Sequence, residues 1–131
     1  MKTATYFSFL ALLMCTIACS TKMRTSEEQL VGRYVGMLST GREEIVLSPD
    51  RSFTQSFSSK SRQLVSRGTW KVRNEFLGGT VIELHGANLS EIDDAESSTR
   101  IGVRILNVQR HQGKIRLVLN EAADWYYDQE N

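Results

Sequence analysis

Two histidines, His85 and His111, are the only imidazole groups in this chain of 131 residues. A zinc or copper site without cysteine would need both of them together with carboxylates, because imidazole, thiolate and carboxylate groups are the usual ligands of these metals. His85 falls on the polar face of an expected strand, and His111 falls in an expected turn. We therefore interpret both as solvated surface histidines and expect no metal and no cofactor.

The serines and carboxylates form no catalytic pattern. The chain contains neither a Gly-x-Ser-x-Gly elbow nor a Ser-x-x-Lys set with its downstream partners. The acidic pairs Glu43–Glu44 and Asp93–Asp94 are adjacent in sequence, and neighbours on a strand point to opposite faces. Exposed histidines would also be a poor general base. We therefore expect a protein that is not an enzyme, since a hydrolase would need a histidine buried beside a carboxylate.

The N-terminal residues have the layout of an export signal. Lys2 precedes an apolar run of about 13 residues, which is shorter than the ~20 residues needed to cross a bilayer as a helix. The run ends in small residues before Cys19. Cys15 follows Met14, where a small side chain is needed for cleavage, whereas Cys19 follows Ala18. The pattern therefore predicts a cleaved signal peptide over residues 1–18 and not a transmembrane helix.

Residues 16–19, Thr-Ile-Ala-Cys, resemble the lipobox of bacterial lipoproteins, in which the cysteine becomes the first mature residue and carries the lipid. Thr16 stands where most lipoboxes have leucine. The resemblance implies acyl chains on Cys19 that hold the protein on a membrane at ~0.8 kcal/mol per buried methylene. Ser20 in place of aspartate implies, by the same resemblance, the outer membrane and a position facing the periplasm. Residues 19–25 would then be the lipidated cysteine and tether, and residues 26–131 the folded domain.

Composition restricts the partners. Removal of Lys2 with the signal leaves 15 basic and 15 acidic residues, so the mature chain has a formal charge of zero. Without a basic field we expect no nucleic-acid partner. Both cysteines lie within residues 1–19, so the domain has no disulfide and no thiolate metal site. A domain of this size can bury a core without such links.

The remaining sequence has the pattern of an all-β domain. Ser26 and Gln29 have capping-box spacing and predict one helical turn. Alternating apolar and polar residues then predict strands, with a tight turn through Pro49 and a hairpin through Gly113. The strands are expected at residues 30–38, 44–47, 52–57, 63–72, 80–85, 101–105 and 115–119. Residues 125–127 are a final strand or a loose end. The insertion at 87–99 lacks the ligand spacing of a calcium loop and is interpreted as a solvated connection.

This pattern favours a β-sandwich or a small antiparallel β-barrel of about seven to eight strands. One set of apolar side chains is expected in its interior, either as core or as the lining of a ligand site: Phe53, Phe57, Trp70, Ile82, Leu84, Ile101, Val103, Ile105, Ile115, Leu117 and Leu119. Six arginines are expected on the outer face, where they would form salt bridges or receive an acidic partner: Arg33, Arg67, Arg73, Arg100, Arg104 and Arg116.

Four segments resemble the lipocalin-like small barrels of bacterial lipoproteins. They are residues 30–34 (Leu-Val-Gly-Arg-Tyr), 45–53 (Ile-Val-Leu-Ser-Pro-Asp-Arg-Ser-Phe), 68–70 (Gly-Thr-Trp) and 81–84 (Val-Ile-Glu-Leu). Tyr34 replaces the usual tryptophan, and Arg51 replaces the usual glycine of the turn. The resemblance implies a single small antiparallel barrel. Envelope-stress and copper-linked relatives carry a Cys-x-x-Cys in this region, which is absent here, so copper chemistry is not transferred.

Three functions follow as hypotheses. The first is a non-enzymatic module that binds a small apolar ligand in the barrel mouth or an envelope protein on its strand faces, with Tyr34, Trp70 and Arg42 as candidate contacts. The second is a periplasmic inhibitor of a hydrolase, similar to lysozyme-inhibitor lipoproteins. Its inserted loop would be residues 38–42, although the cysteine pair common in such inhibitors is missing. The third is a hydrolytic enzyme that uses His85 or His111.

Overall fold

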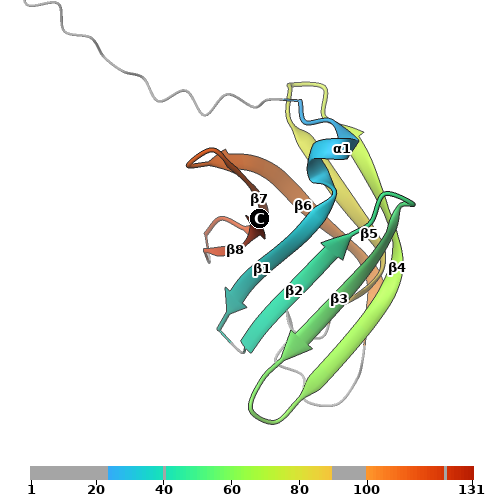
Figure 1. Ribbon diagram of the computed structural model, residues 1–131, viewed down its shortest axis with the longest axis vertical. Helices are drawn as coiled ribbons and strands as arrows, with labels where there is room; N and C mark the ends of the chain where they lie inside the picture. Colours follow the sequence, from blue (N-terminus) through green and yellow to red (C-terminus); the bar gives the residue numbers. More distant parts are fainter. Residues whose placement is uncertain (1–23, 40, 90–99, 123) are drawn as a thin grey trace, which may run out of the picture.

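The computed structural model describes residues 24–39, 41–89, 100–122 and 124–131. One short helix, α1 (Glu27–Leu30), precedes eight antiparallel strands, each paired with the next in sequence. The first strand also pairs with the last, so the sheet closes into a barrel (Figure 1). The strands are β1 (Gly32–Leu38), β2 (Gly41–Leu47), β3 (Ser52–Ser58), β4 (Gln63–Asn74), β5 (Thr80–Asn88), β6 (Ile101–His111), β7 (Lys114–Asn120) and β8 (Trp125–Glu130). The predicted all-β barrel is confirmed, and residues 125–127 belong to its last strand.

The tight turns follow the local sequence signals. In the β2–β3 turn, the Arg51 amide donates to the Ser48 carbonyl oxygen over 3.0 Å, with Pro49 second in the turn. Arg51 adopts a positive φ of 65°, the backbone conformation for which related turns use glycine. In the β6–β7 hairpin, both Gln112 and Gly113 have positive φ, as a two-residue type I′ turn requires.

The barrel has two distinct ends. The upper end in Figure 1 carries α1, the β2–β3 turn and the β4–β5 turn. The strand directions place the β6–β7 hairpin there as well. Thr25 joins the chain to this end, because its amide donates to Oγ1 of Thr80 over 3.1 Å. The lower end carries the β1–β2, β3–β4, β5–β6 and β7–β8 connections.

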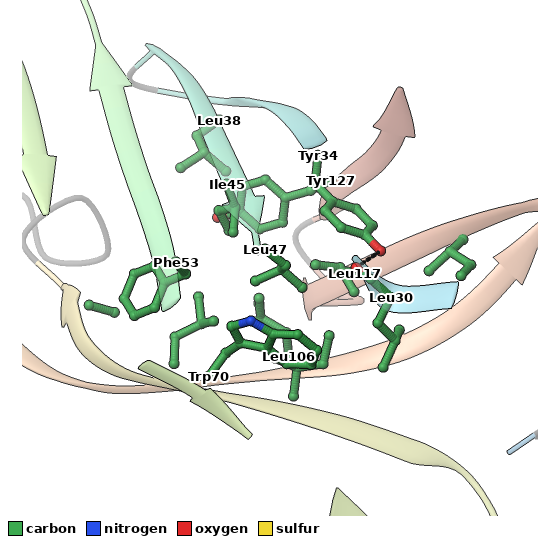
Figure 2. Packing of buried hydrophobic residues seen from close by; sticks show 14 residues of the cluster. Leu30, Tyr34, Leu38, Ile45, Leu47, Phe53, Trp70, Leu106, Leu117 and Tyr127 are labelled. Atoms are coloured by element: carbon green, nitrogen blue, oxygen red, sulfur yellow. Dashed lines mark hydrogen bonds between the residues drawn. The ribbon is translucent and has the colours of Figure 1, made fainter. Parts of the chain in front are cut away.

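The apolar core fills the upper part of the interior. Trp70 is 1% exposed, and the side chains around it are equally buried. Figure 2 shows these side chains pointing inward from the surrounding strands, with the Tyr34 hydroxyl donating to the Leu30 carbonyl oxygen over 2.7 Å. The cluster comprises Leu30, Tyr34, Leu38, Ile45, Leu47, Phe53, Trp70, Ile82, Leu84, Ala87, Leu106, Ile115, Leu117 and Tyr127. Leu30 of α1 thus covers the core from the upper end.

Most of the predicted interior is confirmed. Phe53, Phe57, Trp70, Ile82, Leu84, Ile115 and Leu117 are buried, and Leu119 packs against the core. The prediction for β6 is wrong. Ile101, Val103 and Ile105 are 59%, 48% and 49% exposed, whereas Arg104 and Leu106 point inward at 2% and 0%. The face of β6 that points into the barrel is therefore the opposite of the one that residues 101–105 suggested.

Surface ion pairs connect the strands where the barrel closes. Arg33 of β1 contacts Glu44 of β2 at 2.7 Å and Glu130 of β8 at 2.9 Å. The hydrogen bond to Arg33 holds the pKa of the Glu44 carboxyl below its usual value. Between β7 and β8, Arg116 pairs with Asp128 at 2.6 Å. These are outward arginines, as predicted, and the pair between Arg33 and Glu130 joins the first strand to the last.

Candidate functional site

A group of polar side chains lies buried in the lower half of the barrel. Glu43, Gln55, Ser66, Arg104 and Tyr127 are each no more than 9% exposed. They come from five different strands and meet around the backbone of Asn88. We call these six residues the interior polar cluster.

The Glu43 carboxylate is the centre of the cluster. Arg104 Nη1 and Gln55 Nε2 donate to its Oε1, the latter over 2.6 Å. The Tyr127 hydroxyl donates to Oε2 over 3.1 Å. Both Glu43 and Arg104 are out of contact with solvent, with side-chain exposures of 0% and 1%. The barrel thus encloses a hydrogen-bonded ion pair.

The backbone of Asn88 completes the network. Its carbonyl oxygen accepts from Arg104 Nη2 over 2.6 Å and from Gln55 Nε2 over 3.1 Å. Its amide donates to Gln55 Oε1 over 2.8 Å, and the Ser66 hydroxyl donates to the same oxygen over 2.8 Å. Asn88 ends β5, so the cluster fixes the position at which the chain leaves the barrel wall.

Strand parity puts these groups inside. Ile45 and Leu47 point into the core from β2, so Glu43, two residues earlier, points inward as well. A Cβ on Gly36 would lie 2.6 Å from the Tyr127 ring, so glycine at this position leaves room for that ring. The alternation of inward and outward residues along β2 was a signal that could have predicted an inward position for Glu43. In the sequence, Glu43 stands out only as half of an acidic pair, and the cluster was not predicted.

This arrangement has the properties of a structural ion pair. The three side-chain donors around Glu43 hold it in place, and Arg104 would be costly to bury without its partner. No imidazole contributes a hydrogen bond to the cluster within the described residues. Its physical effect is to tie β2, β3, β6 and β8 together across the interior.

The candidate contacts Tyr34 and Trp70 lie in the core. Tyr34 is 0% exposed, and burial raises the pKa of its hydroxyl. The Trp70 indole Nε1 donates to the Ser48 carbonyl oxygen over 3.0 Å. Both polar atoms therefore have backbone partners, which gives the two aromatic side chains a packing role in the barrel.

Arg42 and the proposed inhibitor loop lie at the lower end. Arg42 is exposed on β2, where it pairs in register with Met37 and Ser58. Gly41 begins the strand, and a Cβ there would lie 2.4 Å from the Ser58 carbonyl oxygen. Within residues 38–42, Leu38 ends β1, and Gly41 and Arg42 begin β2. Position 40 is outside the described residues.

The two histidines are separate. His111 is exposed at the end of β6, on the upper hairpin. His85 of β5 is partly exposed, and its Nε2 lies 3.1 Å from Oε2 of Glu83 on the same strand face. Among the described residues, no group of three or more histidine, cysteine, aspartate and glutamate side chains is placed to hold a metal ion.

The outer surface of β4, β5 and β6 carries apolar side chains on β6 and basic ones on β4, with Glu83 and His85 of β5 between them. Register places Ile105 next to Glu83, which in turn lies next to Lys71 on β4. In the neighbouring row, Val103 lies next to His85 on β5, which in turn lies next to Thr69 on β4. We call this surface the outer β4–β6 face; it comprises Arg67, Thr69, Lys71, Glu83, His85, Ile101, Val103 and Ile105.

β6 is longer than either of its two pairing registers. Residues 101–108 pair with β5, and residues 107–111 pair with β7. The exposed side chains of Ile101, Val103 and Ile105 thus lie on the part of β6 that pairs with β5.

The predicted signal peptide and Cys19 lie outside the described residues, as does most of the acidic insertion. None of the helices in the described ranges is long and apolar enough to span a membrane. Comparison with known proteins found no matching family model, no matching curated protein and no matching solved structure. The class that the fold itself defines is a small closed antiparallel β-barrel, consistent with a lipocalin-like barrel.

Proposed function

We propose that this protein is a lipid-anchored envelope module that binds another protein through its outer β4–β6 face. The observation that carries the proposal is the exposed column Ile101, Val103 and Ile105 on the outward face of β6. Solvent-facing aliphatic side chains in a row are typical of surfaces that accept a protein partner. The predicted export signal and the predicted lipid on Cys19 support a position of this surface in the envelope.

The large side chains buried in the interior favour the outer surface over a ligand in the barrel. Trp70, Phe53 and Leu106 occupy the upper part of the interior, and Glu43 with Arg104 occupies the lower part. A ligand of the size usually bound in such barrels would need a cavity of several hundred Å³. We therefore place the binding activity on the strand faces, which was one of the two possibilities raised by the sequence.

The charges around the column indicate the chemistry of the partner. Arg67 and Lys71 are exposed on β4, and neither makes an ion pair within the described residues. A partner on this face would present apolar side chains to Ile105 and Val103, and acidic ones toward β4. The partner is thus a protein surface that carries both apolar and acidic side chains.

Site-specific photo-crosslinking in intact cells tests this proposal. A photoreactive residue in place of Val103 should give one discrete adduct, and Met37, 72% exposed on β1, is the matched control position. The adduct should disappear when Ile105→Lys is added, because a charge would break the apolar contact. Thermal unfolding of the Ile105→Lys variant should be unchanged, which separates loss of contact from loss of fold.

Two results would contradict the proposal. Equal crosslinking from Met37 and Val103 would mean that the adduct reports proximity and not a specific surface. An adduct that survives both Ile105→Lys and Lys71→Glu would mean that the face contributes nothing to recognition. Either result would return attention to the ligand hypothesis and to the hydrolase-inhibitor hypothesis.

A further inference from the structure

The β4–β5 turn exposes two large apolar side chains at its tip. Phe76 is 100% exposed and Leu77 is 84% exposed. The turn itself is ordered by hydrogen bonds, from the Glu75 amide to the Gly79 carbonyl oxygen over 3.0 Å and from the Gly78 amide back to Glu75 over 3.1 Å. A constrained turn that presents adjacent aromatic and aliphatic residues to water indicates a contact surface.

The chain reaches the barrel beside this turn. Thr25 is 6% exposed and hydrogen-bonded to Thr80, the first residue after the turn. Cys19 and Thr25 are six positions apart, and the chain between them spans at most about 20 Å when fully extended. Leu77 and Thr80 are three positions apart, or at most about 10 Å. A lipid on Cys19 would therefore keep the turn close to the bilayer surface.

The same end of the barrel offers positive charge. Arg24 lies beside Thr25, and Arg110 and Lys114 flank the β6–β7 hairpin; all three are exposed. Register between β5 and β6 pairs Thr80 with Val108, so this hairpin lies next to the β4–β5 turn. None of the three cations makes an ion pair within the described residues.

Most acidic groups at this end are already engaged. Glu27 pairs with Arg51, and Glu75 pairs with Arg73. The Asp50 carboxylate accepts from the Ser52 amide and hydroxyl. Glu28 is the acidic group of α1 for which no such contact is seen in the described part of the chain. Apolar side chains with cations nearby are the composition that favours the interface of an anionic membrane.

We propose that Phe76 and Leu77 insert into the headgroup region of the membrane that carries the lipid anchor, with Arg24, Arg110 and Lys114 facing its anionic lipids. The inference rests on the proposed lipid anchor. It adds a second membrane contact that fixes the orientation of the barrel, with the upper end on the bilayer. The exposed side chains of Ile101, Val103 and Ile105, near the lower end, then lie away from the membrane and toward the compartment.

A fluorescent label at position 77 tests the inference. The lipidated mature chain has no free thiol if Cys19 is modified, so Leu77→Cys introduces a single site for an environment-sensitive dye. The full lipidated protein is placed in vesicles of phosphatidylethanolamine and phosphatidylglycerol. We expect blue-shifted emission and quenching by lipid-borne nitroxides. A label at Met37→Cys, at the lower end, should emit as in water and be quenched by aqueous iodide.

Two further variants test the physical basis. Phe76→Ser in the Leu77→Cys protein should move the label back into water while the protein still floats with the vesicles. Replacing phosphatidylglycerol with phosphatidylcholine should weaken the lipid quenching if the cations contribute. Because both measurements compare proteins that stay folded and anchored, they do not depend on a loss of stability.

The outcomes separate the inference from the anchor. Dye that attaches to the protein without an added cysteine would show that Cys19 is unmodified and would contradict the anchor. An anchored protein whose position 77 label remains in water would overturn the inference and leave the anchor intact. Blue-shifted emission without lipid, growing with protein concentration, would also overturn it, because a second copy of the chain would then cover the turn.

Discussion

Glu43 and Arg104 meet inside the barrel although 61 positions separate them in the chain. The pair is closed to solvent, and each partner has further hydrogen bonds to the wall of the barrel. A buried ion pair contributes little net stability by itself, yet removal of one partner leaves an uncompensated charge. This relationship leads to the first prediction.

Arg104→Met should lower the free energy of unfolding by about 3–5 kcal/mol, because Glu43 would remain buried without its cation. The double variant Glu43→Leu with Arg104→Met should lose less than the sum of the two single changes, since no lone charge remains. Urea unfolding of the four proteins of the cycle measures the coupling. Arg67→Met, on the exposed face of β4, is the control. Additive single effects would contradict a direct interaction.

The inverted face of β6 gives a sharp contrast between neighbours. Leu106→Ala should cost about 2–5 kcal/mol because a fully buried side chain leaves a cavity. Ile105→Ala, one residue away and half exposed, should change stability far less, within about 1 kcal/mol. Denaturant titrations of the two variants are sufficient. If Ile105→Ala proved the more damaging change, the strand would have the opposite register.

Trp70→Ala should destabilise the domain by about 3–5 kcal/mol, since the indole is buried on all sides and would leave a large void. The outward neighbour Lys71→Ala should stay within about 0.5 kcal/mol of the parent. Guanidinium unfolding followed by circular dichroism compares them. A Trp70→Ala protein with unchanged stability would place the ring at a binding surface instead.

Acid should remove the contribution of the Glu44 ion pair. Its hydrogen bond to Arg33 lowers the folded-state pKa below the ordinary value of 4.5. The stabilisation is therefore complete above the unfolded pKa and is lost as pH falls through the folded one. Glu44→Gln should be less stable than the parent at pH 7, by at most about 1 kcal/mol for such an exposed pair. The difference should vanish in strong acid. Glu28→Gln serves as the control, and a gap that persists unchanged at low pH would contradict the assignment.

The domain should carry no bound small molecule. Native mass spectrometry of residues 20–131 is expected to give the mass of the polypeptide alone, because large apolar side chains and the interior polar cluster are buried inside the barrel. The denatured sample provides the reference mass. Additional mass that disappears on denaturation would favour the ligand hypothesis, and its value would begin to identify the ligand.

The sequence predicted those parts of the fold that depend on local signals. Pro49 in its turn, Gly113 in its hairpin and the alternation around Trp70 act over a few residues, and all three predictions are confirmed. Each signal reflects a backbone preference or a strand period that needs no distant partner. The strand pattern alone left a sandwich and a barrel open, and the resemblance to small lipocalin-like barrels favoured the closed form that β1 and β8 complete.

The interior polar cluster depends on distant partners, which explains why it was missed. In β6, Ile101, Val103 and Ile105 lie on one face of the strand, and Arg104 and Leu106 lie on the other. Hydrophobicity alone favoured the three aliphatic residues as the buried face. Arg104 is inside because Glu43, Tyr127 and the Asn88 carbonyl oxygen receive it there. Only a pattern extended to Leu106 and Val108 would have shown that the face carrying Arg104 also carries apolar side chains.

Barrel closure between β1 and β8 has a consequence for how the protein is made. Arg33 pairs with Glu130, about 100 residues later, so the first strand has no permanent neighbour on one side until the last strand emerges. At the usual rate of about 5–20 residues per second, that wait lasts roughly 5–20 s. Until β8 is made, any sheet that has formed is open at β1, which makes timely access to a holding chaperone a condition of its assembly.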